Sequence, residues 1–167
     1  FNLNADKKIK ELSRGMKVKL MLASALSHHA KLLLLDEPTS GLDPVAREEI
    51  CDILREFVSD DNHSVFFSTH ITSDLEKIAD YIVFILDGRI VYSGEKFELI
   101  ETYSLIKGGL DDLNDSIKSQ SIGLRKHSTG FETLYPNDYL NQLSTNILIE
   151  SSTLEEIIIY MNKELKR

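Results

Sequence analysis

The chain has 167 residues, of which 42% are hydrophobic, and it carries a formal net charge of −8. This length suits one or two domains, and the acidic balance argues against a general affinity for nucleic acid. The single cysteine, Cys51, excludes an internal disulfide framework and fits a reducing compartment, and no apolar run reaches the roughly 18 residues of a membrane span.

The first part of the chain alternates between helical and extended patterns. Residues 14–28 predict a helix, which we expect to be buried because residues 20–26 are nearly all apolar. Residues 32–35 are too few for a helix and predict a strand covered on both faces. Residues 44–58 predict an amphipathic helix, and "SVFFSTH", residues 64–70, predicts a second buried strand.

The next segments predict a short helix and a hairpin. Ser73 and Glu76 form the pattern of a capping box for the helix. The segment "YIVFILDGRIVYSG", residues 81–94, predicts two strands joined by a tight turn at Asp87-Gly88. Strand, helix and strand in this order indicate a parallel α/β core with an antiparallel hairpin at its edge. We assign this core to residues 1–106.

The pattern changes after about Ile106. Scattered Ser and Asn residues and short apolar runs predict a small α+β extension over residues 107–167. We expect the extension to end in a helix capped by Thr153 and Glu156.

Two adjacent acids end the first predicted strand, in "LLLLDEP". Asp36 and Glu37 would lie at the carboxyl edge of a parallel sheet, where α/β folds bind ligands. Asp36 there could hold Mg²⁺ directly or through water, while the neighbouring carboxylate polarises an attacking water. Taken alone, the pair is equally compatible with a helix cap or a surface ion pair.

Three other segments allow both a functional and a plainly structural interpretation. In "LSRGM", residues 12–16, Ser13 is a good N-cap and Gly15 permits close approach to the backbone. Such a helix start can bind phosphate or can simply be capped. Asp43 before Pro44 fits an ordinary N-cap. Histidines at positions 28, 29, 63, 70 and 127, each taken alone, are more often core or surface residues.

Together and in this order, "LSRGM", "LLLLDEP", "SGLD" and "STH" resemble the signature motif, Walker B motif, D-loop and switch histidine of an ABC transporter ATPase. The resemblance covers roughly residues 9–100. It implies an α/β ATPase core with a parallel sheet and flanking helices, an ATP hydrolase activity, and ATP and Mg²⁺ as ligands.

The resemblance also implies a role for each motif residue. Asp36 would hold Mg²⁺ through water, Glu37 would be the general base, and His70 would donate a hydrogen bond to the γ-phosphate. In this family the signature motif acts on ATP bound to the opposite subunit, which implies that role for Ser13, Arg14, Gly15 and Met16. The D-loop would organise the dimer interface through Ser40, Gly41, Leu42 and Asp43.

The chain departs from the family pattern in two respects. Arg14 and Met16 replace the usual signature glycine and glutamine, so a fixed glutamine contact cannot be assumed. The P-loop pattern G-x-x-x-x-G-K-[ST] is absent, and none of the eight glycines is followed by lysine. Because the P-loop precedes the signature motif in this family, we expect the chain to be a C-terminal half that is inactive alone.

The resemblance further implies partners and a location. We expect a second ATPase subunit, integral membrane permease subunits, no nucleic acid, and a position at the cytoplasmic face of a bacterial cell membrane. The tail segments "SLIKGG", "IGLRKHSTGFETL" and "LEEIIIYMNKE" resemble bacterial exporters of the drug and antibiotic-resistance type. A family-neutral packing or dimerisation module is the alternative for this tail.

Two other functions share parts of these motifs. ABC-type ATPases of DNA repair, chromosome organisation or translation usually add coiled coils, zinc-binding cysteines or basic linkers. The single cysteine, the acidic balance and the lack of long heptads argue against them. A non-enzymatic remnant that only binds a partner is the third possibility, and the presence of Glu37 and His70 argues against it for the parent protein.

Overall fold

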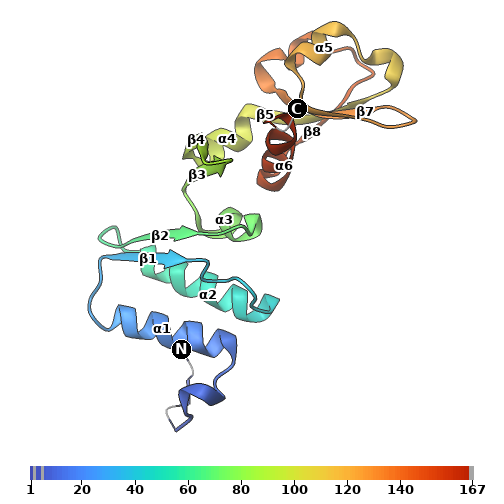
Figure 1. Ribbon diagram of the computed structural model, residues 1–167. Coiled ribbons are helices and arrows are strands. Elements are labelled where there is room, and N and C mark those ends of the chain that lie inside the picture. Colours follow the sequence, from blue (N-terminus) through green and yellow to red (C-terminus); the bar gives the residue numbers. More distant parts are fainter. Residues whose placement is uncertain (2, 5, 166–167) are drawn as a thin grey trace. The chain divides into compact units, whose positions relative to one another are not determined.

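The computed structural model describes residues 1, 3–4 and 6–165, and these form two compact units. The first unit is Phe1–Ile78, and the second begins at Ala79 (Figure 1). Each unit has a hydrophobic core of its own. Among the described residues, no helix is both long enough and apolar enough to cross a membrane.

The first unit is built on two parallel strands. β1 (Leu32–Asp36) pairs with β2 (Ser64–Ser68), and the register runs from Leu32 opposite Ser64 to Asp36 opposite Ser68. The other elements of this unit are η1 (Ile9–Glu11), α1 (Arg14–Leu26), α2 (Pro44–Val58) and α3 (Thr72–Ile78). The predicted helix over 44–58 is therefore confirmed, and the predicted helix over 14–28 ends slightly earlier.

The core of the first unit joins α1, β1 and α2. Its buried members are Leu22, Leu33, Leu42, Ile50 and Leu54. Cys51 on α2 is also fully buried, and its burial raises the pKa of the thiol to about 11. The parallel strands and the helix between them thus form one packed unit, as the strand–helix–strand order predicts.

The prediction that these elements are fully buried is wrong for one face of the sheet. Leu34 is 70% exposed and its neighbour on β2, Phe66, is 65% exposed, whereas Leu33 is buried. α1 likewise leaves Met21 half exposed. The reason is that the core described above covers one face of β1, and the described residues leave the opposite face open.

This open face makes self-association an expected property of the chain. Leu34 and Phe66 lie side by side on adjacent strands, and exposed apolar patches of this kind promote association. We expect the chain to bind an apolar dye and to form larger species in light scattering as concentration rises. The double substitution Leu34→Ser and Phe66→Ser should reduce both signals, whereas Val45→Ser, at an exposed position on α2, should not. A strict monomer without bound dye would contradict this expectation.

The second unit contains a hairpin and a four-stranded antiparallel sheet. β3 (Tyr81–Leu86) and β4 (Arg89–Glu95) form the hairpin, and Asp87 and Gly88 both have positive φ, which confirms the predicted turn. The sheet has the strand order β6-β7-β5-β8. Its strands are β5 (Tyr103–Gly108), β6 (Ile122–Lys126), β7 (Phe131–Pro136) and β8 (Leu148–Ser151).

Helices complete this unit, and the last of them begins as expected. They are α4 (Lys96–Thr102), η2 (Leu110–Asp112), α5 (Asp115–Gln120), η3 (Asn137–Gln142) and α6 (Leu154–Leu165). Before α6, the Thr153 backbone N–H donates to a Glu156 carboxylate oxygen at 2.9 Å, and the Glu156 N–H donates to the Thr153 hydroxyl at 3.2 Å. The predicted capping box is therefore present.

One predicted helix cap differs from the structure, and one predicted domain boundary stays a prediction. The domain boundary expected between residues 106 and 107 stays a prediction; both residues lie in β5, which pairs with β7 and β8, and the chain divides into its two compact units between Ile78 and Ala79. α3 begins at Thr72, so Ser73 lies inside the helix rather than at its cap.

Candidate functional site

The first group of predicted site residues lies at the carboxyl ends of β1 and β2. Because the strands are parallel and in register, Asp36 and Ser68 end them side by side. The Ser68 hydroxyl donates to an Asp36 carboxylate oxygen at 2.5 Å. This contact orients Asp36 at an exposed edge of the sheet and leaves its second oxygen for a ligand.

Glu37 follows directly and points to a different partner. Its backbone N–H donates to the Ser68 carbonyl at 3.1 Å, and its backbone has a φ of +48°. Both carboxylate oxygens lie 2.8 Å from Nδ1 of His70. The carboxylates of the two acids therefore have separate partners, Ser68 for Asp36 and His70 for Glu37, and Glu37 lies just beyond the end of β1. A positive φ at a non-glycine residue is uncommon and often accompanies functional sites.

The edge is accessible to a ligand. The His70 side chain is 70% exposed, and that of Glu37 is 35% exposed. A carboxylate paired with an accessible histidine can accept a proton from a bound water, and the histidine can donate to an anionic group. The arrangement therefore fits proton transfer next to a phosphate.

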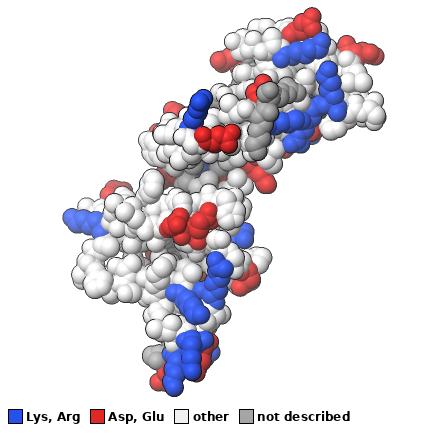
Figure 2. Space-filling view, in the orientation of Figure 1, with Lys and Arg blue, Asp and Glu red and all other residues white. Residues whose placement is uncertain are grey.

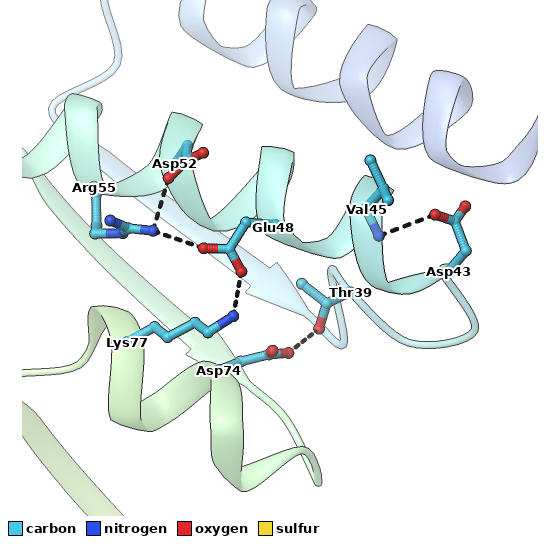
Figure 3. Close-up of polar contacts among 8 residues, drawn as sticks. All are labelled: Thr39, Asp43, Val45, Glu48, Asp52, Arg55, Asp74 and Lys77. Atoms are coloured by element: carbon cyan, nitrogen blue, oxygen red, sulfur yellow. Dashed lines mark hydrogen bonds and ion pairs between the residues drawn. The ribbon is translucent and has the colours of Figure 1, made fainter.

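The turn after Glu37 leads into α2. The Ser40 N–H donates to the Glu37 carbonyl at 3.2 Å, and Gly41 has a φ of +68°, which favours glycine. Asp43 caps α2 by accepting hydrogen bonds from the N–H groups of Val45 at 3.1 Å and Ala46 at 3.0 Å (Figure 3 draws the first). The N-cap interpretation of Asp43 is therefore confirmed, and Leu42 packs into the core.

The segment "LSRGM" forms the start of α1. Ser13 accepts a hydrogen bond from the Met16 N–H at 3.2 Å, which confirms the predicted N-cap and leaves the hydroxyl hydrogen to donate. Gly15 is buried against α2, where an added Cβ would lie 3.0 Å from the Ala46 Cβ. The glycine thus permits the close approach of two helices.

Arg14 connects this helix start to the turn. A Cβ added to Gly41 would lie 2.6 Å from Nη1 of Arg14, so the guanidinium lies directly over the glycine. The contact depends on the arginine at position 14 and on a glycine at position 41. Sequence spacing alone carried no signal of it, because the two residues are 27 positions apart.

The predicted residues therefore form two groups within the first unit. Asp36, Glu37 and His70 make up the strand edge, and Ser13, Arg14, Gly15 and Met16 start α1 beside the turn at Ser40, Gly41, Leu42 and Asp43. Sequence reasoning missed Ser68, which holds Asp36. The parallel pairing of "LLLLD" with "SVFFS" would have indicated it, because both strands end at the same edge.

The donor set at the edge fits one particular mode of Mg²⁺ binding. The described residues contain no group of three or more His, Cys, Asp or Glu side chains that could enclose a metal ion. Mg²⁺ usually keeps several waters and is bound by one or two carboxylates together with substrate phosphates. A single accessible carboxylate, Asp36, fits that mode of binding rather than an all-protein cage.

Charged side chains elsewhere on this unit form a mixed network. On α2, Glu48 accepts from Arg55 at 3.2 Å and also pairs with Lys77 of α3, whose hydrogen bond is the main cause that lowers the pKa of Glu48 (Figure 3). Asp52 accepts from the same arginine at 2.7 Å. Basic and acidic side chains intermingle on the visible face of each unit, as Figure 2 shows. This pattern differs from the basic stripe of a nucleic-acid interface.

One protein-family model matches the part of the chain that contains the candidate site. A family model described as an AAA domain, and named for the AbiEii toxin of type IV TA systems, matches residues 7–73. This range contains all the predicted site residues.

Curated relatives are ABC transporter ATP-binding proteins. YxlF of Bacillus subtilis is 45% identical over 57% of this chain and 32% of its own length. The lantibiotic transport ATP-binding protein SrtF of Streptococcus pyogenes is 43% identical over 55% of this chain and 40% of its own length. YtrB of Bacillus subtilis is 30% identical over 95% of this chain and 58% of its own length. The chain thus spans about a third to three fifths of these relatives.

Solved structures agree on the fold. An ATP-binding cassette of an ABC transporter in its ADP conformation is similar with a TM-score of 0.50 and 24% identity, over 56% of this chain and 36% of that one. An inward-facing ABC transporter is similar with a TM-score of 0.50 and 22% identity, over 76% of this chain and 48% of that one. The α/β fold of ABC ATPase cassettes is therefore confirmed.

Proposed function

Because this chain is homologous to the ATP-binding proteins of ABC transporters, we propose that it supplies the hydrolytic part of an ATPase subunit. The observation that carries the proposal is the strand edge where Asp36, Glu37 and His70 meet. The sequence lacks a P-loop pattern, so the groups that cradle the triphosphate would come from outside this chain.

Each residue of the edge has a distinct proposed role. Asp36, oriented by Ser68, would hold Mg²⁺ through water beside the nucleotide. When bound, Mg²⁺ neutralises phosphate charge and orients the triphosphate. Glu37 would accept the proton of the attacking water, and His70 would hold Glu37 and then donate to the γ-phosphate. The 2.8 Å contact between these two side chains supports this division of labour.

A second subunit would complete the site. The start of α1 presents the Ser13 hydroxyl and the N-terminal end of a helix, which are suited to an anionic phosphate. In a dimer, Ser13 to Met16 would close over ATP bound by the opposite subunit, and Ser40 to Asp43 would lie at the interface. The position of Arg14 over Gly41 supports joint movement of these two segments.

The proposed setting is transport across a bacterial membrane. One relative is named as a lantibiotic transport protein and another, BcrA of Bacillus licheniformis, as a bacitracin transport protein. These names support an exporter ATPase that works with integral membrane permease subunits at the cytoplasmic face of the membrane. Residues 1–106 would be the partial ATPase domain and residues 107–167 an accessory extension, since several relatives match little more than half of the chain.

Asp36→Asn tests this proposal in the complete subunit. Loss of the carboxylate should weaken the affinity for Mg²⁺-nucleotide by roughly 10- to 100-fold, the range found for residues that hold a metal through its outer shell, so that more Mg²⁺ is needed for binding, and turnover should fall as well. The measurement is ATP hydrolysis and ATP binding as functions of Mg²⁺ concentration. Asp52→Asn, at an exposed acid of α2, is the control and should leave both curves unchanged. An unaltered Mg²⁺ dependence in Asp36→Asn would contradict the proposed role.

A further inference from the structure

A buried polar contact joins the two segments that follow the strand edge. The Thr39 hydroxyl donates to Oδ2 of Asp74 at 2.5 Å, as Figure 3 shows. Thr39 is 1% exposed and Asp74 is fully buried. The contact joins the turn after β1 to the first turn of α3, across 35 positions of sequence.

Asp74 is an unusual residue for this position. A carboxylate that is removed from water is unfavourable unless hydrogen bonds or opposite charges compensate it. The second carboxylate oxygen, Oδ1, has no hydrogen-bond partner among the described residues. The nearby Lys77 ammonium pairs with Glu48 instead. An apolar pair would pack this position without such a cost, which indicates a role beyond filling the core.

The contact is linked to both proposed catalytic side chains through short backbone paths. Thr39 is two residues after Glu37, and the turn between them is closed by the Ser40 N–H donating to the Glu37 carbonyl at 3.2 Å. Asp74 is four residues after His70, and its own N–H donates to the Ile71 carbonyl at 3.1 Å. Any shift between the turn and α3 would therefore move Glu37 relative to His70.

The backbone of Glu37 is held to β2 by the Ser68 carbonyl, but the contact between the Glu37 and His70 side chains is exposed. The His70 side chain is 70% exposed, so its contact with Glu37 is open to competing water. Glu37 also has the uncommon φ of +48°, a conformation that persists only where the surrounding structure holds it. The Thr39–Asp74 contact is buried and short, and it joins the segments that directly follow both residues.

We propose that Thr39 and Asp74 are positioning residues that keep Glu37 and His70 in the geometry required for hydrolysis. The inference rests on the proposed ATPase function. Neither residue touches the nucleotide in this account, so the contact should affect the chemical step rather than ATP affinity. A displacement of about 1 Å at a reacting group is enough to reduce rates by roughly 10²-fold.

Thr39→Val and Thr39→Ser in the complete subunit form the matched test. Valine has nearly the same shape as threonine but lacks the hydroxyl, whereas serine retains it. With turnover expressed per nucleotide-binding site, we expect Thr39→Val to lower kcat by roughly 10- to 100-fold while KM for ATP changes by less than about threefold. Thr39→Ser should stay within about threefold of the unmodified subunit. An unchanged kcat in Thr39→Val, or an equal loss in both variants, would overturn the inference.

A double variant separates positioning from stability. In Thr39→Val the buried Asp74 carboxylate loses its hydrogen-bond donor. Replacing both partners, as Thr39→Val with Asp74→Leu, removes this carboxylate and should restore much of any thermal stability that Thr39→Val loses. We expect kcat to remain low in this variant because the contact is still missing. Recovery of kcat together with stability would show a purely structural role and overturn the proposal.

The contact can also be tested without ATP hydrolysis. In the present chain, amide hydrogen exchange over residues 39–42 should be roughly tenfold faster in Thr39→Val than in Thr39→Ser. Equal exchange in both variants would contradict the proposed positioning contact. A complete subunit that shows normal exchange behaviour but hydrolyses no ATP would instead count against the proposed function.

Discussion

Replacing Glu37 by glutamine in the complete subunit is expected to lower the rate of ATP hydrolysis by roughly 10²- to 10⁴-fold, the usual contribution of a general base. Glutamine has the same length and can still contact Nδ1 of His70, which lies 2.8 Å from the carboxylate. It cannot accept the proton of the attacking water. The loss should therefore appear in kcat, which steady-state hydrolysis measures directly.

ATP binding should survive the same substitution. Asp36 has its own partner, Ser68, and does not depend on the Glu37 side chain. The subunits should consequently accumulate as an ATP-bound dimer, detectable by light scattering and by retained nucleotide. Glu49→Gln is the matched control, because Glu49 is a half-exposed carboxylate on α2 that pairs with Lys19 at 2.7 Å. Near-normal turnover in Glu37→Gln would show that the base had been assigned to the wrong residue.

Local chemistry explains which features could be predicted from the sequence. The Asp87-Gly88 turn, the Asp43 cap and the Thr153–Glu156 box each depend on residues within three positions of one another. Whether these three local structures form does not depend on the packing of distant segments. The strand edge differs, because Glu37 and His70 are 33 positions apart; it was predicted from the resemblance of the ordered motifs to a known family.

Exposure could not be predicted, because it depends on what covers an element. The leucines of β1 form a continuous apolar run, which is typical of a strand covered on both faces. Leu33 faces the core, but Leu34 is 70% exposed because the described residues leave its side of the sheet open. The apolar sequence of a strand indicates that the strand is stable when both faces are covered. It does not indicate whether other segments of this chain cover them.

Long-range polar contacts were also beyond prediction. Thr39 reads as an ordinary turn residue and Asp74 as an ordinary acid in the first turn of a helix. Only the parallel pairing of β1 with β2 brings the residues after each strand together, so that these two meet in a buried contact. The contact between Arg14 and Gly41 arises in the same way from the packing of α1 on α2.

The most direct test of the account is a calorimetric titration of this 167-residue chain with ATP and Mg²⁺, alongside the complete subunit. A P-loop lysine and its backbone N–H groups normally hold most of the triphosphate charge, and this sequence has no such pattern. Protection of the buried Cys51 thiol from reagents would verify that the chain is folded during the titration. We expect saturable binding by the complete subunit, and neither saturable binding nor hydrolysis above the buffer rate by this chain. Tight, Mg²⁺-dependent ATP binding by the 167 residues alone would contradict the account.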